Sequence, residues 1–236
     1  MRAITILSLF IFASSCTPSA SAQKSLVIED FEGYEIDGLP SLWRIPDKRS
    51  RTMRVLPPDH AKPNDYVKVV MGEGGQVLRA YTQGESVQIA LPKGDGLEWD
   101  VDQFPRLRWR WRADQLPEGA REDRRSLNDT GAALYVAFEC NDWLGRPCTI
   151  KYTYSSALPE GVLARYGKLQ ALVVSSALEF NEGWIEIERN VVEDYEMFFG
   201  RQPPQFPLYI MLWNDSDNTG GVADVYFDDI VALSGE

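Results

Sequence analysis

The feature that most constrains the fold is a long series of short apolar or alternating segments, separated by clusters of glycine, proline, asparagine and aspartate. Such segments at fairly even spacing are typical of β-strands joined by turns, and many of them in one chain indicate a β-sandwich or jelly roll. We therefore predict an all-β fold with strands over residues 25–31, 66–71, 76–81, 86–91, 106–113, 132–139, 149–155, 169–176, 184–191, 208–213 and 225–233.

One segment has the pattern of a short helix instead. Residues 192–200 read VEDYEMFFG, and a helix there is ended by Gly200, with two prolines shortly beyond it. Residues 46–65 and 118–131 show no strand pattern, so we predict long loops. With 44% hydrophobic residues and no linker in the pattern, the sequence predicts a single β-sandwich domain over residues 25–236.

The charge balance excludes two classes of partner. The chain has 24 lysines and arginines against 35 aspartates and glutamates, a formal net charge of −11. Without a concentrated basic face, such a chain repels the phosphates of nucleic acids and the headgroups of an anionic membrane surface. We therefore expect no nucleic-acid partner and no adsorption to a membrane surface.

The N-terminal residues have the pattern of an export signal. Arg2 precedes an apolar run from Ile4 to Ala13, which is too short to span a bilayer. Cys16 follows small residues directly at the end of this run and resembles the lipidated cysteine of bacterial lipoproteins. This pattern predicts a signal peptide over residues 1–15 and a flexible tether over residues 16–24.

Ordinary signal peptidase offers an alternative, because Ala20, Ser21 and Ala22 fit its preference for small residues and would place the cut after residue 22. The first alternative predicts an outer-membrane lipoprotein in the periplasm, with a lipid anchor on Cys16 as its sole membrane contact. The second predicts a soluble periplasmic or secreted protein.

The remaining cysteines support an oxidising compartment. Cys140 and Cys148 bracket NDWLGRP, a turn-forming segment, and an even pair of cysteines in an exported chain predicts a disulfide. Two free thiols in a loop are the alternative. A zinc site is excluded because the chain has one histidine, His60, in a proline-rich segment.

Residues 215–230, DSDNTGGVADVYFDDI, are rich in possible ligand-binding groups. Asp215, Asp217 and Asn218 belong to a turn, and a strand that ends on Asp228 and Asp229 follows them. Carboxylates beside a turn at a strand end can bind a hard cation or a polar ligand. The alternative is a solvated turn followed by an edge strand.

The strand at residues 106–113 alternates aromatic and basic side chains. Trp109 and Trp111 share one face, which we predict to be buried in the core, with a stacking platform as the alternative. The arginines between them need acidic neighbours or an anionic ligand, and Glu186 and Glu188 share a face of the strand predicted at 184–191. We expect these acids to pair with the arginines.

Several blocks occur together in a specific order: FPRLRWRWRADQLPEGA, ND followed by ALYVAF, GWIEIERNVVEDYEMFFG, and DSDNTGGVADVYFDDI. On these blocks, the chain resembles the bacterial domain-of-unknown-function family numbered 3047 over residues 26–233. The resemblance implies an exported, single-domain β protein, without an established activity. The chain departs from the family pattern at Ala133, where an arginine is expected, and at Tyr154, where tryptophan is frequent.

The two ends of the chain also resemble carbohydrate-binding jelly-roll modules, which open with an acidic strand around Phe31 and close with a pattern like YFDDI at 226–230. In such modules, carboxylates from the first and last strands hold a structural calcium. The resemblance implies a calcium site, with ligands Asp30, Glu32, Asp228 and Asp229. Pairing of these acids with lysine or arginine is the alternative.

These observations leave three functions open. The first is a non-catalytic module that binds a saccharide or another envelope polymer through Tyr152, Tyr154, Trp143, Asp215, Asp217 and Asn218. Core packing of Tyr152 and Tyr154 is the alternative, because both share a face with Ile150. The second is a hydrolase or lyase acting on polysaccharide, with paired carboxylates drawn from Glu186, Glu188, Asp129, Asp215 and Asp217. The third is a purely structural lipoprotein. No nucleophile or phosphate-loop motif is present, so the sequence favours the binding module.

Overall fold

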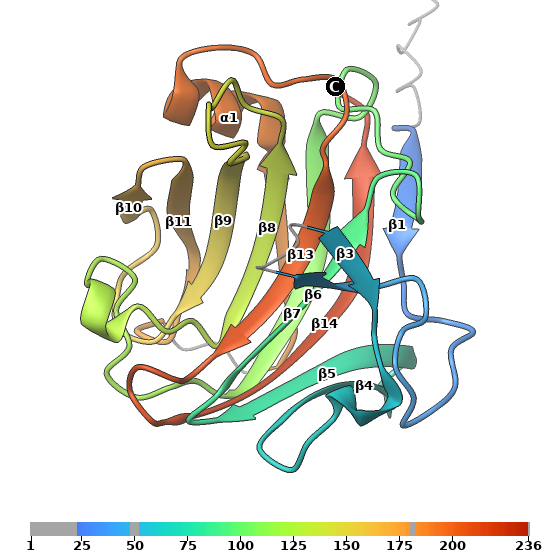
Figure 1. The fold of residues 1–236 in the computed structure, drawn as a ribbon, viewed down its shortest axis with the longest axis vertical. Helices are drawn as coiled ribbons and strands as arrows, with labels where there is room; N and C mark the ends of the chain where they lie inside the picture. Colours follow the sequence, from blue (N-terminus) through green and yellow to red (C-terminus); the bar gives the residue numbers. More distant parts are fainter. Residues whose placement is uncertain (1–22, 48–51, 180–182, 236) are drawn as a thin grey trace, which may run out of the picture.

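The computed structural model is a sandwich of two β-sheets, with one α-helix at one end (Figure 1). It describes residues 23–47, 52–179 and 183–235. The predicted fold class, an all-β sandwich with one short helix, is confirmed. The predicted signal peptide and Cys16 lie outside the described residues.

The smaller sheet has six strands, and all of its neighbouring strands are antiparallel. Its order is β12-β7-β14-β5-β4, and β1 pairs with the second half of β14, which is therefore a central strand. The strands are β1 (Ser25–Glu29), β4 (Asp65–Gly72), β5 (Gly75–Gln83), β7 (Arg106–Gln115), β12 (Ile185–Asn190) and β14 (Val222–Leu233).

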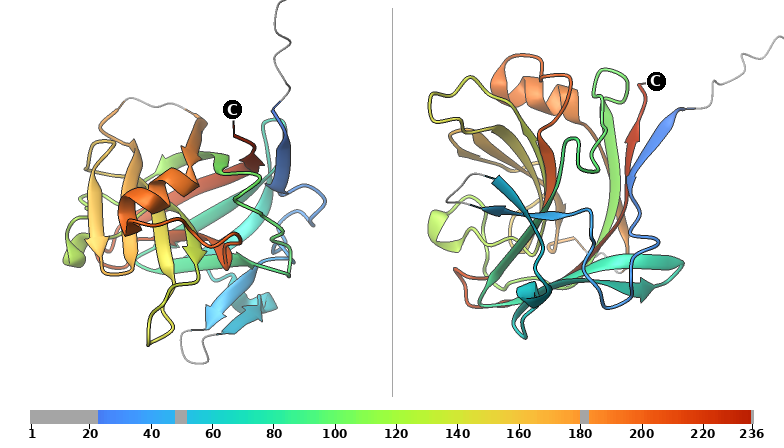
Figure 2. Two further views of the ribbon diagram at one scale, coloured as in Figure 1. Left: turned by 90° about the horizontal axis from the view of Figure 1, so that it is seen from above. Right: turned by 45° about the vertical axis from the view of Figure 1, so that its right-hand side comes forward.

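The larger sheet has eight strands in the order β10-β11-β9-β8-β13-β6-β2-β3. Its strands are antiparallel except for the parallel pair β9 and β11. They are β2 (Arg44–Asp47), β3 (Thr52–Val55), β6 (Ser86–Pro92), β8 (Ala132–Phe138), β9 (Cys148–Ser155), β10 (Leu163–Tyr166), β11 (Leu169–Ser176) and β13 (Tyr209–Asp215). Figure 2 shows both sheets from two further directions.

Aromatic side chains from both sheets fill the core between them. Trp109 and Trp111 of β7 are fully buried, as predicted, and their rings contact those of Tyr152 and Tyr154 of β9. The ring centroids of Trp109 and Tyr152 lie 5.2 Å apart. Large aromatic contacts of this kind contribute both buried apolar area and favourable ring geometry, so they hold the two sheets together.

The arginines of β7 lie on the opposite face, and they have the acidic neighbours that the sequence predicts. Arg108 lies 3.9 Å from Glu186, and Arg106 pairs with Glu188, both across the β7–β12 ladder. Exposed cross-strand ion pairs contribute a few tenths to about 1 kcal/mol each. The prediction that Glu186 and Glu188 pair with the arginines of the neighbouring strand is therefore confirmed.

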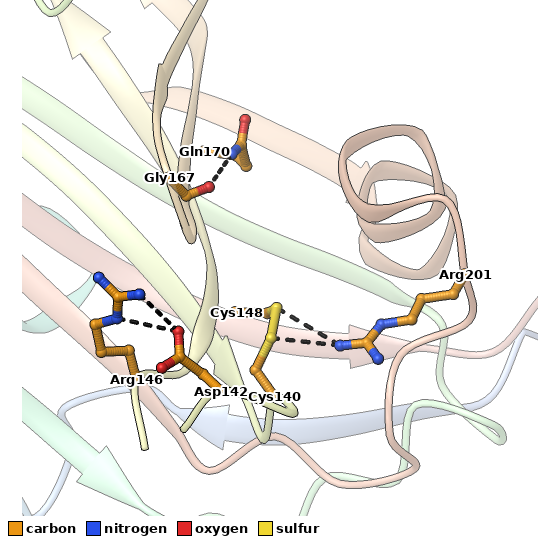
Figure 3. Close-up of a disulfide and its surroundings, with 7 residues drawn as sticks. All are labelled: Cys140, Asp142, Arg146, Cys148, Gly167, Gln170 and Arg201. Carbon is orange, nitrogen blue, oxygen red and sulfur yellow. Dashed lines mark hydrogen bonds and ion pairs between the residues drawn. A yellow bond between two sulfur atoms is a disulfide. The ribbon is translucent and has the colours of Figure 1, made fainter. Parts of the chain in front are cut away.

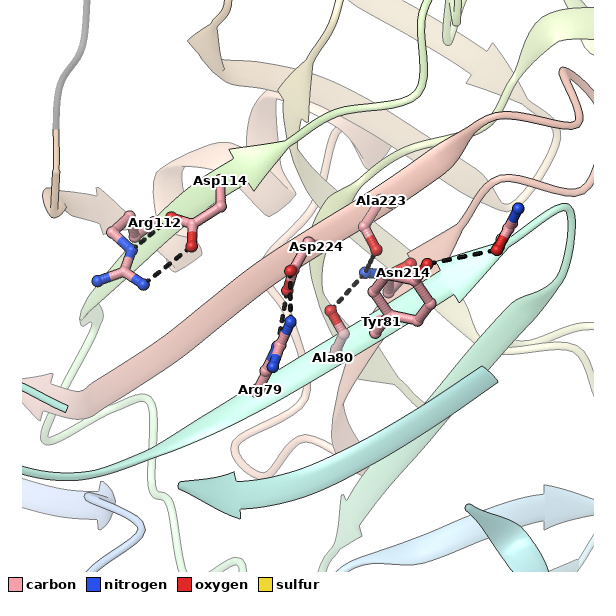
Figure 4. Close-up of polar contacts among 9 residues, drawn as sticks. Arg79, Ala80, Tyr81, Arg112, Asp114, Asn214, Ala223 and Asp224 are labelled. Atoms are coloured by element: carbon pink, nitrogen blue, oxygen red, sulfur yellow. Dashed lines mark hydrogen bonds and ion pairs between the residues drawn. The ribbon is translucent and has the colours of Figure 1, made fainter. Parts of the chain in front are cut away.

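A polar bridge joins the sheets beside the core. The buried side chain of Asn214 on β13 donates hydrogen bonds to the carbonyl oxygens of Ala80 on β5, at 2.9 Å, and Ala223 on β14, at 3.4 Å (Figure 4). The same view shows Arg79 paired with Asp224 on the outer face of the smaller sheet. Because a buried amide is costly without partners, Asn214 helps to fix how the two sheets align.

The helix α1 (Val191–Phe199) lies within one residue of its predicted position. Asn190 caps it by accepting a hydrogen bond from the backbone N–H of Glu193, and Gly200 ends it in the left-handed conformation at φ 68°. Among the described residues, no helix has the length and apolar character needed to cross a membrane.

The two predicted long loops contain more structure than the sequence indicates. The first, residues 46–65, contains β3 and the 3₁₀ turn η1 (Pro58–His60), and the second, residues 118–131, contains η2 (Arg125–Leu127). The short strand β10 was not predicted either. Strands β2, β3 and β10 have four residues each and lie at or near the edges of the larger sheet, so burial does not impose a clear alternation on them.

Candidate ligand-binding cavity

A cavity of about 360 Å³ lies on the face of the larger sheet that points away from the core. We call it the outer-face cavity. Strands β8, β9, β11 and β13 form its floor, since alternate side chains on these strands point to opposite faces. The loop before β8, which contains η2, and the end of β10 complete it. It is lined by Glu122, Arg125, Asn128, Tyr135, Lys151, Tyr166, Leu169, Ala171, Trp213 and Asp215.

Two of the three aromatic rings that line the cavity stack on each other. The rings of Tyr135 on β8 and Trp213 on β13 stack, with centroids 5.6 Å apart and planes inclined by 26°. Ala133 lies directly opposite Trp213 in the β8–β13 register, at the position where the family pattern predicts an arginine. The small side chain of Ala133 leaves the Trp213 ring against Tyr135, and Trp213 remains partly exposed.

Lys151 places a buried positive charge in the cavity. Its ammonium group donates a 2.7 Å hydrogen bond to Oγ1 of Thr130 and lies 5.6 Å from the centroid of the Tyr135 ring. Burial lowers the pKa of Lys151, and the negative charges of Glu122, Asp215 and Asp129 act in the opposite direction. An ammonium group has three donors, and one of them has a partner among the described residues.

Glu122 adds a buried carboxyl group to the same cavity. Ser155 donates a 2.6 Å hydrogen bond to Oε2 of Glu122, whereas Oε1 has no hydrogen bond of good geometry among the described residues. Burial raises the pKa of this carboxyl. Glu122 therefore offers the cavity either an acceptor or, when protonated, a donor.

Asp215 stands at the edge of an acidic cluster with Asp129 and Asp217, and one carboxylate oxygen of each lies within 4.8 Å of the others. Burial, followed by the charges of Asp217 and Asp129, raises the pKa of Asp215 to about 7. The nearest donor to the Asp215 carboxyl is the backbone N–H of Asp217, at 3.5 Å. Three such carboxyl groups could together hold a hard cation.

Asp129 has a structural role in this cluster, because it fixes the turn after β13. It accepts hydrogen bonds from the backbone and side chain of Asn218, at 2.9 and 3.1 Å, and of Thr219, at 2.7 and 2.6 Å. Burial raises the pKa of Asp129, but the hydrogen bonds from Thr219 and Asn218 outweigh this and lower it below its ordinary value. Asp129 and Asp215 therefore differ in protonation although they are neighbours.

The structure separates the residues predicted to bind a polar ligand. Asp215 lines the cavity, and Asp217 and Asn218 lie beside it on the turn that Asp129 holds. For Tyr152 and Tyr154, the prediction of ligand contact is corrected. Both side chains are buried between the two sheets, and the hydroxyl of Tyr152 donates a hydrogen bond to Asp194. The alternation of β9 points these tyrosines to the core and points Lys151 to the cavity.

Trp143 lies in the loop that the disulfide closes, and 90% of its side chain is exposed. The predicted disulfide between Cys140 and Cys148 is confirmed, with Cα atoms 5.3 Å apart (Figure 3). Within this loop, Asp142 accepts hydrogen bonds from Arg146, as the same view shows. Trp143 is thus displayed on a cross-linked loop, and it is not among the residues that line the outer-face cavity.

The four carboxylates of the predicted calcium site do not meet at one point. The first and last strands do pair, as predicted, with Glu29 opposite Ile230. However, Asp228 and Asp229 both form ion pairs with Arg110, at the position where the register of β14 shifts. For Asp228 and Asp229, the structure therefore agrees with the alternative prediction, in which a basic side chain, here Arg110, neutralises the carboxylates.

The two acids of the first strand region have backbone partners instead. Glu32 accepts a 2.9 Å hydrogen bond from the N–H of Gln76, and Asp30 accepts one from the N–H of Glu32 at 3.1 Å. Among the described residues, the acidic cluster that could hold a cation is the one at Asp129, Asp215 and Asp217.

Of the ten residues that line the cavity, sequence reasoning named Asp215 alone. Four of those that it missed are Glu122, Tyr135, Lys151 and Trp213. Three of them follow from a signal that was present: in β8, β9 and β13 they alternate with the core residues Leu134, Ile150 and Leu212. The residues that alternate with the core residues of a strand therefore predict which side chains lie on the outer face of the sheet. Glu122 comes from a loop, and no local pattern places it there.

The fold and the cavity define a class: a β-sandwich protein with an aromatic and charged cavity on the outer face of its larger sheet. The chain belongs to the family described as protein of unknown function DUF3047, whose family model matches residues 54–231. A comparison with curated protein sequences finds no match.

Among solved structures, the chain is similar to the family 11 carbohydrate-binding module of the cellulase Lic26A-Cel5E of Clostridium thermocellum, at 12% identity and a TM-score of 0.41, covering 92% of this chain and 97% of that chain. It is also similar to a family 27 module of Caldicellulosiruptor saccharolyticus in complex with mannohexaose, at 13% identity and a TM-score of 0.41, covering 89% and 96%. TM-scores of this size carry no argument about the ligand of this chain, so function has to be argued from the cavity itself.

Proposed function

We propose that this chain is a non-catalytic binding module of the bacterial cell envelope, and that it holds a saccharide or a similar polar ligand in the outer-face cavity. One observation carries the proposal: an aromatic stack and several incompletely hydrogen-bonded polar groups meet in one cavity of about 360 Å³. Small-molecule sites are commonly cavities of roughly 300–1,000 Å³ with an apolar surface and a few convergent polar groups.

The chemistry of the lining matches a polyhydroxylated ligand. Lys151 has donors without a partner, and Oε1 of Glu122 and the carboxyl of Asp215 lack a short hydrogen bond among the described residues. A sugar hydroxyl both donates and accepts, so it satisfies groups of both kinds. The C–H face of a sugar ring also packs on an aromatic surface such as Trp213. Buried polar groups without partners are costly, which favours a ligand that supplies them.

Isothermal titration calorimetry with a panel of neutral and acidic oligosaccharides tests the proposal. Trp213→Ala should abolish measurable binding, because it removes a partly exposed ring on the floor of the cavity. Trp143→Ala is the matched control, since it removes an exposed tryptophan outside the cavity. Binding that survives in Trp213→Ala and is lost in Trp143→Ala places the ligand at the disulfide loop. A panel without any binder leaves the purely structural lipoprotein as the better account.

One observation favours a second candidate, a hydrolase or lyase acting on polysaccharide. Asp129 and Asp215 are adjacent carboxyls whose pKa values move in opposite directions, a pattern that acid–base pairs in enzymes share. Against this role, four donors already occupy both oxygens of Asp129. This candidate is supported if the intact protein releases reducing ends from members of a polysaccharide panel and the variant Asp215→Asn does not. If the intact protein releases no reducing ends from any polysaccharide of the panel, the enzyme candidate is excluded.

Two features support the location in the envelope. The apolar segment before Cys16 has the pattern of an export signal, and the cross-link between Cys140 and Cys148 fits an oxidising compartment. The proposal takes the protein to be anchored to the outer membrane by a lipid on Cys16, which leaves the β-sandwich free to meet a polymer in the periplasm.

A further inference from the structure

Two cationic side chains line the outer-face cavity without a carboxylate partner. Among the described residues, neither Lys151 nor Arg125 has a carboxylate oxygen within ion-pair distance. The guanidinium of Arg125 lies 5.8 Å from the centroid of the Tyr166 ring, on the side of the cavity formed by η2. Arginines elsewhere in the chain, such as Arg79 and Arg110, do have acidic partners.

The two acids of the cavity contribute less negative charge than their number indicates. Burial raises the pKa of both Glu122 and Asp215, in the case of Asp215 to about 7. Near neutral pH the Asp215 carboxyl therefore holds a proton part of the time, and Glu122 accepts a hydrogen bond from Ser155 through one of its oxygens. Arg125 therefore presents its guanidinium charge to a ligand, and Lys151, whose pKa burial lowers against the opposing charges of Glu122, Asp215 and Asp129, is held in its charged form by a bound anion.

We infer that the ligand carries a carboxylate, as a uronic acid residue of an acidic polysaccharide does, and that Lys151 and Arg125 bind this group. The inference rests on the proposed function and specifies the class of saccharide. A carboxylate accepts from the ammonium of Lys151 and from the fork of an arginine, and such charge-assisted hydrogen bonds are roughly twice as strong as neutral ones. The hydroxyls of the same sugar serve Glu122 and Asp215.

The net charge of −11 does not argue against an acidic ligand. Repulsion between a polyanion and distant surface charges is screened beyond about 8 Å at physiological salt, whereas contacts with a buried group are screened much less. Affinity for the acidic saccharide should therefore be retained between low and physiological salt. Binding to scattered surface cations would instead weaken steadily over the same range.

The experiment uses pairs of disaccharides that differ by one group, a neutral sugar and its uronate, in gluco, galacto and manno configurations. Calorimetry with the intact protein should show at least about tenfold tighter binding of the uronate in the preferred pair. Lys151→Met, which keeps the length of the side chain, should remove most of this preference. Arg125→Gln should reduce it about threefold, as expected of an exposed charge.

Arg124→Gln is the matched control, because Arg124 is an exposed neighbour of Arg125 that does not line the cavity, and it should leave the preference unchanged. Arg125→Gln alters an exposed side chain, so it remains informative even if Lys151→Met fails to fold. Equal affinity for the neutral and acidic members overturns the inference while leaving the proposed function standing. The absence of binding to every member overturns both.

Discussion

The ionisation of Asp215 should make the protein less stable as the pH rises, and replacing Asp215 with asparagine should remove this loss of stability. The carboxyl is buried at the end of β13 and faces Asp217, Asp129 and Lys151. Burial is the largest cause that raises its pKa, and the two acids add to it, while Lys151 opposes them. Asp215→Asn keeps the shape of the side chain and cannot ionise, so it isolates the effect of the charge.

The magnitude follows from the pKa. In the folded protein, the pKa of Asp215 rises from an ordinary value of 3.8 to about 7, which is equivalent to about 4 kcal/mol. Between these two values the folded state binds more protons than the unfolded state, so the free energy of unfolding falls as the pH increases. The full contribution is reached above pH 7. Asp215→Asn should therefore be neutral near pH 4 and stabilising by about 3–4 kcal/mol at pH 8.

Urea denaturation of the intact protein at pH 4.5, 6 and 8 measures this difference, provided that unfolding is two-state. The exposed Asp102→Asn is the control, and it should change the free energy of unfolding by less than about 0.5 kcal/mol at every pH. A gain for Asp215→Asn that is the same at pH 4.5 and pH 8 would refute the reasoning. So would a loss of stability at pH 8.

Three further outcomes follow from the structure. Trp109→Ala should lower the free energy of unfolding by about 3–5 kcal/mol in urea denaturation, whereas the exposed Trp143→Ala should change it by less than about 0.5 kcal/mol; similar values for the two would contradict the assignment of the core. Replacing Cys140 and Cys148 together with alanine should cost about 2–3 kcal/mol, and an unchanged urea midpoint would show that the cross-link does not stabilise the sandwich. Cys16→Ser should abolish incorporation of radiolabelled palmitate and release the protein from the membrane fraction; continued labelling would exclude Cys16 as the anchor.

Most of the fold is predictable from the sequence because burial imposes a period of two on long strands. The runs RLRWRWRA and TIKYTYS alternate clearly, and both became strands that pack their aromatic side chains into the core. The hairpin of β2 and β3 and the strand β10 carry no such pattern. Their side chains are mostly exposed or half-buried, so the position of these strands depends on the edges of a sheet already formed.

The site is less predictable for a different reason. Sequence reasoning named Tyr152 and Tyr154 as candidate contacts, with core packing as the alternative because both share a face with Ile150. The alternation of β9 turns them inward, as that alternative requires. It named Asp215, Asp217 and Asn218 because their turn is rich in polar groups, and Asp215 does line the cavity. Asp217 is a neighbour of Asp215 in sequence, but Asp129 and Lys151 lie more than 60 positions away, and only the folded sheet brings them close to Asp215.

The position of β14 has a consequence for how the chain matures. This strand follows all the others in sequence, yet it lies between β7 and β5 in the middle of the smaller sheet, and β1 also pairs with it. Until β14 is available, β5 and β7 have no common neighbour, and the N-terminal strand has no partner among the described residues. A nascent chain of this topology cannot close its smaller sheet while it is being synthesised.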